Sequence, residues 1–142
     1  MTRLAALATV ALAVLALPAL ADDHADIEAG KKNFNKCKAC HSITAPDGTK
    51  IFAGGPVGPN LYGVIGRTAG SLDGYKYSTA MMEAGEKGLV WDQDNIVTYV
   101  ADPKKFLAEF LDVQKVTTKM TFRTNKGVDD IAAYLVSVGP QN

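Results

Sequence analysis

A stretch rich in glycine and proline, residues 42–73, most constrains what this chain can fold into. It contains the runs PDG, AGGPVGPN and AGS, and it carries no sustained alternation of polar and apolar residues. Such runs form turns, so no β-sheet is expected. A loop of this length among short helices buries little apolar surface, and a small core supplies only a few kcal/mol of net stability. We therefore expect something other than side chains to fill the centre.

Length and composition limit the alternatives. The chain has 142 residues, 47% of them hydrophobic and 21% charged, which fits one small globular domain and excludes a multidomain enzyme or a disordered chain. Fifteen basic residues balance fifteen acidic ones. With no net field to attract a polyanion, binding to nucleic acid is not expected.

The N-terminus has the pattern of a secretory signal peptide. Residues 4–17 are almost entirely apolar, Arg3 provides the positive charge before them, and a proline and small residues lead to Ala21. An uncleaved membrane anchor needs about 20 apolar residues, and this run is shorter. We expect cleavage after Ala21, with residues 1–21 removed and residues 22–142 forming a periplasmic domain.

Helical signals occupy the two ends and the second half of the chain, and they predict a mostly α fold of about five short helices with long loops. Each signal combines a capping residue or a helix stop with apolar residues at helical spacing. The predicted helices are an N-terminal one capped by Asp26, one over Thr79–Glu86 capped by Ser78, one opened by Asp92 or Asp94, one opened by Asp102-Pro103, and one carrying Ile131 to Val138 before Gly139-Pro140.

Residues Cys37 to His41 read CKACH, the C-x-x-C-H pattern of covalent haem attachment. Two thiols three positions apart on a helical turn can each add to one vinyl group of the same porphyrin, and the following imidazole then faces the iron. A thioredoxin-like redox pair is the alternative, but it is expected near a βαβ pattern, which this sequence lacks. One covalent haem c is therefore predicted.

His41 would bind the iron on one face, and the ligand on the other face decides between electron transfer and small-molecule chemistry. His24 lies in the acidic N-terminal segment. Met81 and Met82 are consecutive on a predicted helix, where a place in the core is the ordinary expectation. Met120 lies between helices in the sequence TKMTF, a strap that could place a thioether over the haem, and we favour it.

The sequence resembles the class I cytochromes c, and within them the long-loop bacterial cytochromes c2, over essentially the whole chain after the signal segment. Longer loops at residues 42–57 and 108–117 distinguish it from the shorter mitochondrial pattern. The motifs that carry the resemblance are, in order, CKACH, GPNLYG (58–63), GRTAG (66–70), YKY (75–77), Trp91 followed by Tyr99, DPKKF (102–106), TKMTF (118–122) and IAAYL (131–135).

The resemblance implies a set of site residues. Cys37 and Cys40 would form the haem thioethers, and His41 and Met120 would be the two axial iron ligands. The Pro59 carbonyl would accept a hydrogen bond from the His41 ring and fix its orientation. Other side chains implied to surround the haem are, near the propionates, Arg67, Tyr77, Trp91 and Thr118, and, near the methionine sulfur, Tyr99.

The neutral total charge conceals an asymmetry. Residues 31–38 and 115–126, which flank the attachment motif and Met120, hold eight basic residues and no acidic one, whereas the rest of the chain after Ala21 holds six basic and fifteen acidic residues. This distribution favours steering toward acidic protein partners. The candidate docking residues are Lys31, Lys32, Lys36, Lys38, Lys115, Lys119, Arg123 and Lys126.

Together these features predict a soluble, periplasmic, monomeric electron carrier and not an enzyme, because two protein ligands would leave no iron position for a substrate. The resemblance implies reduction by a cytochrome bc1 complex and oxidation by a photosynthetic reaction centre or a terminal oxidase. Two alternatives stay open. A labile Met120 would make the chain a gas sensor or peroxidase, and free Cys37 and Cys40 would make it a thiol–disulfide oxidoreductase.

Overall fold

A computed structural model describes residues 25–140 of the chain. The expected signal segment, its cleavage point and His24 lie outside these residues. No helix in residues 25–140 is long and apolar enough to cross a membrane. The elements are α1 (Ile27–Asn33), a short 3-10 helix η1 (Phe34–Lys36), β1 (Ile43–Thr44), β2 (Lys50–Phe52), α2 (Thr79–Glu86), α3 (Gln93–Ala101), α4 (Pro103–Leu111) and α5 (Val128–Ser137).

The predicted mostly α architecture is confirmed, and four of its helices begin where the capping residues predict. Each cap side chain accepts a backbone N–H from the first turn of its helix, and the caps are Asp26, Ser78, Asp92 and Asp102. Asp92, and not Asp94, opens α3, because the Asn95 side chain completes a reciprocal capping box with it. Helix α5 begins earlier than its apolar period suggests, at Val128, after Gly127 in a left-handed conformation.

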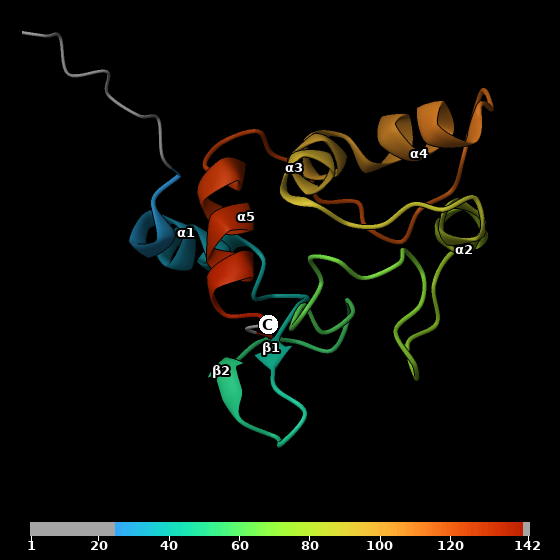
Figure 1. The fold of residues 1–142 in the computed structure, drawn as a ribbon. Coiled ribbons are helices and arrows are strands. Elements are labelled where there is room, and N and C mark those ends of the chain that lie inside the picture. Colours follow the sequence, from blue (N-terminus) through green and yellow to red (C-terminus); the bar gives the residue numbers. More distant parts are fainter. Residues whose placement is uncertain (1–24, 141–142) are drawn as a thin grey trace, which may run out of the picture.

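The terminal helices α1 and α5 pack against each other, and α3 packs on α5 and on α4 (Figure 1). Gly30 permits the α1–α5 crossing. A Cβ atom at Gly30 would lie 2.0 Å from the Asp130 carbonyl oxygen and 2.8 Å from the Tyr134 Cβ, so only glycine allows these backbones to approach this closely. The crossing fixes the start of the chain, and with it the attachment motif, against the C-terminal helix.

The expectation of no β-sheet was wrong. Strands β1 and β2 form a two-stranded antiparallel sheet in which Ile43 pairs with Phe52 and Thr44 with Lys50, with an irregularity between the pairs. Strands of two and three residues are too short to show a period of two, so the sequence carried no alternation to detect. The buried Ile43 side chain ties this hairpin to the core.

Apolar side chains from the helices and the hairpin form one core cluster, in which Phe34, Ile43 and Leu107 are fully buried. The segment between β2 and α2 runs as turns, as the sequence predicts, and it contributes one wall of a central cavity. The cavity is therefore the candidate location of the non-protein group that the sequence analysis expects.

Candidate functional site

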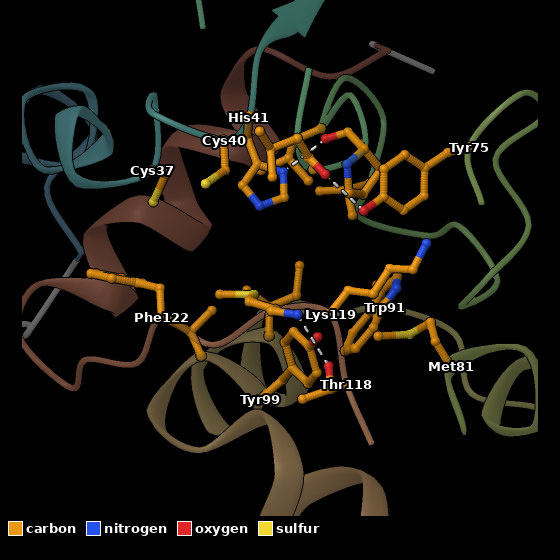
Figure 2. Close-up of a pocket in the computed structure, with 18 of the residues that line it drawn as sticks. Cys37, Cys40, His41, Tyr75, Met81, Trp91, Tyr99, Thr118, Lys119 and Phe122 are labelled. Atoms are coloured by element: carbon orange, nitrogen blue, oxygen red, sulfur yellow. Dashed lines mark hydrogen bonds between the residues drawn. The ribbon is translucent and has the colours of Figure 1, made fainter. Parts of the chain in front are cut away.

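The central cavity has a volume of about 310 Å³, and its walls come from segments far apart in the sequence. Figure 2 shows Cys37, Cys40 and His41 on one side of it and Tyr99, Thr118 and Phe122 on the other. Helices α3 and α5 close the interior with apolar side chains. Every residue that the resemblance implies for the haem lines this one cavity: Cys37, Cys40, His41, Pro59, Arg67, Tyr77, Trp91, Tyr99, Thr118 and Met120.

The attachment motif forms one helical turn. The backbone N–H groups of Cys40 and His41 both donate to the Cys37 carbonyl, at 3.1 and 2.9 Å. A turn of this kind brings positions i and i+3 to the same face. Both thiols and the imidazole therefore face the cavity, as Figure 2 shows.

The His41 ring is held in one orientation. Its Nδ1 lies 2.8 Å from the Pro59 carbonyl oxygen, and a carbonyl can only accept a hydrogen bond, so Nδ1 carries the proton in the neutral ring. The lone pair then resides on Nε2 and is available to a metal. Burial lowers the His41 pKa, opposed by the bond to Pro59, which favours the neutral form that binds metal.

Gly58 is required beside this ring. A Cβ atom at that position would lie 2.3 Å from His41 Cε1 and 2.6 Å from Nδ1. The backbone N–H of Gly58 also donates to the Cys40 carbonyl at 2.7 Å. The loop before Pro59 is thus joined to the attachment motif and packed closely against the imidazole.

Cys37 is poorly suited to act as an attacking thiol in this setting. Burial raises the pKa of the Cys37 thiol to about 11, although the nearby Lys36 opposes the shift. Thiol–disulfide oxidoreductases instead lower the pKa of the attacking cysteine to about 7 or less. The high pKa of Cys37 speaks against the oxidoreductase alternative.

Met120 lies on the strap between α4 and α5, half-buried against the core. Its backbone N–H donates to the Thr118 hydroxyl at 3.3 Å, and Thr118 is itself buried and bonded to the Tyr99 side chain. Further along, the Thr124 N–H donates to the Val100 carbonyl at 3.1 Å. These contacts fix the strap to α3 on both sides of Met120.

The polar residues of the cavity are positioned by neighbouring backbone and rings. The Arg67 guanidinium donates to the carbonyls of Asn60, at 3.0 Å, and Tyr62, at 3.3 Å. Burial lowers the pKa of Arg67, and the neighbouring Tyr77 opposes that shift. Trp91 packs on Tyr99 with ring centroids 5.0 Å apart. Arg67, Tyr77 and Trp91 all line the cavity.

The residues present fit a covalent haem. The walls combine apolar side chains with two thiols, one imidazole whose Nε2 is free of a proton, and one thioether. This donor set matches His/Met haem ligation. In residues 25–140, no group of three or more His, Cys, Asp or Glu side chains could hold a bare metal ion. The donor set and the apolar walls thus fit a porphyrin.

All eight candidate docking residues are exposed, but their charges are not equally free. The Lys36 ammonium donates to the Lys126 carbonyl at 3.1 Å and so joins the two basic windows in space. Lys36 and Lys119 also border the cavity. Arg123 lies 3.5 Å from the Asp102 carboxylate, which offsets part of its charge.

Sequence reasoning assigned no role to two residues of the site. Gly58 belongs to the GPNLYG motif, yet nothing in its neighbourhood indicates contact with an imidazole seventeen residues earlier. Tyr75 begins the YKY motif, and its hydroxyl donates to the Val57 carbonyl at 2.9 Å. Both roles depend on loops that meet only in the folded chain.

Comparison with known proteins places these observations in one family. The model of the cytochrome c family matches residues 27–139. Cytochrome c2 of Rhodobacter capsulatus is 54% identical over 131 residues, which cover 92% of this chain and 93% of that protein. Cytochrome c-550 of Paracoccus denitrificans is 48% identical over 135 residues, covering 94% of this chain and 86% of that protein.

Solved structures agree with the sequence relatives. The structure of cytochrome c2 from Rhodobacter capsulatus superposes with a TM-score of 0.78 at 53% identity, covering 80% of this chain and 97% of that one. The cytochrome c2 structure from Paracoccus denitrificans gives a TM-score of 0.79 at 47% identity, covering 81% and 97%. The similarity thus extends across nearly the entire length of each solved protein.

Proposed function

Because this chain belongs to the cytochrome c family, as a class I c-type cytochrome, we propose that it is a soluble periplasmic electron carrier with His41 and Met120 as axial haem ligands. Its cofactor is a covalently bound haem c, and Cys37 and Cys40 fit the attachment motif. It is an electron-transfer protein and not an enzyme. The proposed mature chain comprises residues 22–142.

The ligation proposal rests on one observation, namely that His41 and Met120 line the same cavity. The bond from His41 Nδ1 to Pro59 leaves Nε2 as the metal-binding nitrogen. The contacts of Thr118 with Tyr99 and of Thr124 with Val100 hold the Met120 segment against α3. With His41 and Met120 both bound to the iron, the chain would leave no open position there for water or a small substrate.

The surroundings favour electron transfer over substrate turnover. When bound, haem c supplies a one-electron Fe(III)/Fe(II) couple. The apolar walls disfavour the state with the extra positive charge, and a thioether ligand favours reduced iron, so a positive potential is expected. The hydrogen bonds at His41 and on the strap limit rearrangement of both ligand segments.

The basic windows are proposed to steer the carrier to acidic partners, with a cytochrome bc1 complex as donor and a photosynthetic reaction centre or cytochrome oxidase as acceptor. Lys36 supports this role, because it borders the cavity and joins the two windows. The carrier is proposed to act as a monomer. Screening shortens the Debye length from about 10 Å at 0.1 M to about 3 Å at 1 M salt, so long-range steering is lost at high salt.

Stopped-flow oxidation of the reduced holoprotein by an acidic-faced redox partner tests this function. Lys38→Glu should slow the bimolecular rate and flatten its salt dependence. Lys104→Glu makes the same charge change at an exposed position of α4, outside the basic windows, and should have the smaller effect. Equal effects of the two variants, or a rate independent of salt, would remove the steering proposal.

Localisation needs its own test, since the segment before residue 25 is outside the described structure. N-terminal sequencing of the protein from a periplasmic extract should give a chain that starts at Asp22. A chain that retains Met1 and sediments with membranes would instead make the protein an anchored carrier.

A further inference from the structure

The chain contains two Asp-Gly pairs, and the proposed function uses neither. Asp47-Gly48 lies in the turn between β1 and β2, and Asp73-Gly74 lies in the loop before α2. Both pairs are exposed, and both glycines have a positive φ, of 87° and 77°. A Cβ atom at either glycine would meet nothing within 4 Å. The two pairs therefore have the same steric freedom, and they differ in their hydrogen bonds.

The Asp47-Gly48 pair is restrained by the hairpin turn. The Gly48 N–H donates to the Ala45 carbonyl at 2.9 Å, and the Asp47 carboxylate accepts the Thr49 N–H, also at 2.9 Å. The Ala45 N–H donates to the Thr49 carbonyl at 2.9 Å and closes the turn. Hydrogen bonds from the Thr49 N–H and hydroxyl lower the pKa of Asp47, which favours its ionised form. The turn thus fixes both the glycine nitrogen and the aspartate side chain.

The Asp73-Gly74 pair lacks these restraints. In residues 25–140, neither the Asp73 carboxylate nor the Gly74 N–H has a hydrogen-bond partner. One backbone bond closes the turn, from the Tyr75 N–H to the Leu72 carbonyl, and at 3.4 Å it is long. Rotation of the Asp73 side chain and of the peptide that follows it therefore breaks at most one weak hydrogen bond.

We propose that Asp73-Gly74 is a site of spontaneous isoaspartate formation, and that the hairpin protects Asp47-Gly48 from the same reaction. The Gly74 nitrogen attacks Cγ of the protonated Asp73 side chain and a C–N bond forms. The carboxyl hydroxyl leaves with the N–H proton as water, which closes a succinimide ring. Water then opens the ring at either carbonyl, giving aspartate or isoaspartate. The water released in the first step balances the water consumed in the second, so no other reactant is needed.

The neighbours of this turn place the modification beside the central cavity. The Tyr77 hydroxyl shares a hydrogen bond with the Leu72 backbone, and Tyr77 lines the cavity. The Tyr75 ring packs on Tyr77 with centroids 4.7 Å apart, and it lies 5.7 Å from the Lys119 ammonium, a cation–π separation. Isoaspartate routes the main chain through the side-chain carbon and so lengthens it between Leu72 and Tyr75. We expect this added length to disturb the packing of Tyr75 and Tyr77 at the cavity wall.

Ageing of the folded holoprotein at neutral pH tests the site. Peptide mapping with electron-transfer fragmentation distinguishes isoaspartate from aspartate, which have the same mass, and quantifies both at positions 47 and 73. Reaction in the hairpin requires the loss of two hydrogen bonds, at the Gly48 N–H and at the Asp47 carboxylate, against at most one weak bond at Asp73. Isoaspartate should therefore form at least about fivefold faster at Asp73 than at Asp47, the factor that corresponds to one hydrogen bond.

Two variants and one change of conditions make the result specific. Asp73→Glu keeps the charge but lengthens the side chain, so the succinimide ring cannot form and the signal at position 73 should vanish. Thr49→Ala removes the hydroxyl contact to the Asp47 carboxylate, so it should raise the rate at Asp47 and leave the rate at Asp73 unchanged. In urea both pairs lose their folded surroundings, and the ratio of the two rates should fall toward one.

Equal isoaspartate at the two positions of the folded holoprotein, or more at Asp47, would overturn the proposal. A ratio in the folded protein that equals the ratio in urea would also overturn it, because the selectivity would then come from adjacent residues in the sequence and not from the fold. Neither outcome depends on which residues bind the iron, so the proposed function is tested separately.

Discussion

Gly58→Ala should disturb the site through the His41 ring. The added Cβ would lie 2.3 Å from His41 Cε1, about 1 Å closer than the 3.4 Å at which ordinary contact begins. The ring would have to move, and its bond to Pro59, now 2.8 Å, would lengthen or break. Overpacking costs about 1–3 kcal/mol and a lost hydrogen bond about 1 kcal/mol, so a loss of about 2–4 kcal/mol of unfolding free energy is expected.

Denaturant unfolding of the ferric holoprotein measures that loss, and the reduction potential reports the disturbed histidine. Gly139→Ala is the milder control, because its Cβ would lie 3.3 Å from the Leu135 carbonyl oxygen, only just inside ordinary contact, and neither glycine has a positive φ. An unfolding free energy for Gly58→Ala within about 0.5 kcal/mol of wild type, the range of ordinary surface substitutions, would refute the reasoning.

Three further predictions concern the frame around the site. Gly30→Ala should lower the free energy of unfolding, measured with denaturant, by about 3 kcal/mol, because its Cβ would lie 2.0 Å from the Asp130 carbonyl oxygen. Asp102→Ala should lower the free energy of unfolding by about 1–2 kcal/mol, because the cap of α4 is lost. Arg123→Ala removes only the exposed ion pair with Asp102 and should lower it by less than about 1 kcal/mol. Equal losses in the two variants would contradict this order. Burial raises the pKa of Tyr99 above 10.0, so this phenol ionises in the unfolded state before it ionises in the folded state. The free energy of unfolding should therefore fall as the pH rises past 10. In Tyr99→Phe this fall should be shallower.

Local signals in the sequence were sufficient for most of the helical frame. Ser78 and Asp102 begin their helices as predicted because capping depends on a few adjacent residues. The β1–β2 hairpin escaped prediction because pairing of such short strands depends on the buried Ile43 and not on a periodic pattern. The early start of α5 at Val128 was hidden for a related reason, since its N-cap makes no side-chain hydrogen bond.

The difference between local sequence signals and contacts between separate segments also applies to the site. Contiguous motifs revealed Cys37, Cys40 and His41, because covalent attachment requires fixed spacing. The role of Gly58 and the engagement of Lys119 by Tyr75 arise where separate loops meet, and no spacing rule connects them. The docking prediction counted charge alone, and so it treated Lys119 as equivalent to Lys38 although their surroundings differ.

The most direct test of the central claim is X-ray absorption at the iron edge of the holoprotein, which reads the ligand atoms themselves. The account predicts one sulfur ligand in the wild type, retained in Met81→Ala and Met82→Ala and lost in Met120→Ala. Met81 lines the cavity and Met82 does not, so the pair controls for methionines inside and outside the site. A sulfur ligand that persists in Met120→Ala, or an iron without sulfur in the wild type, would contradict the account.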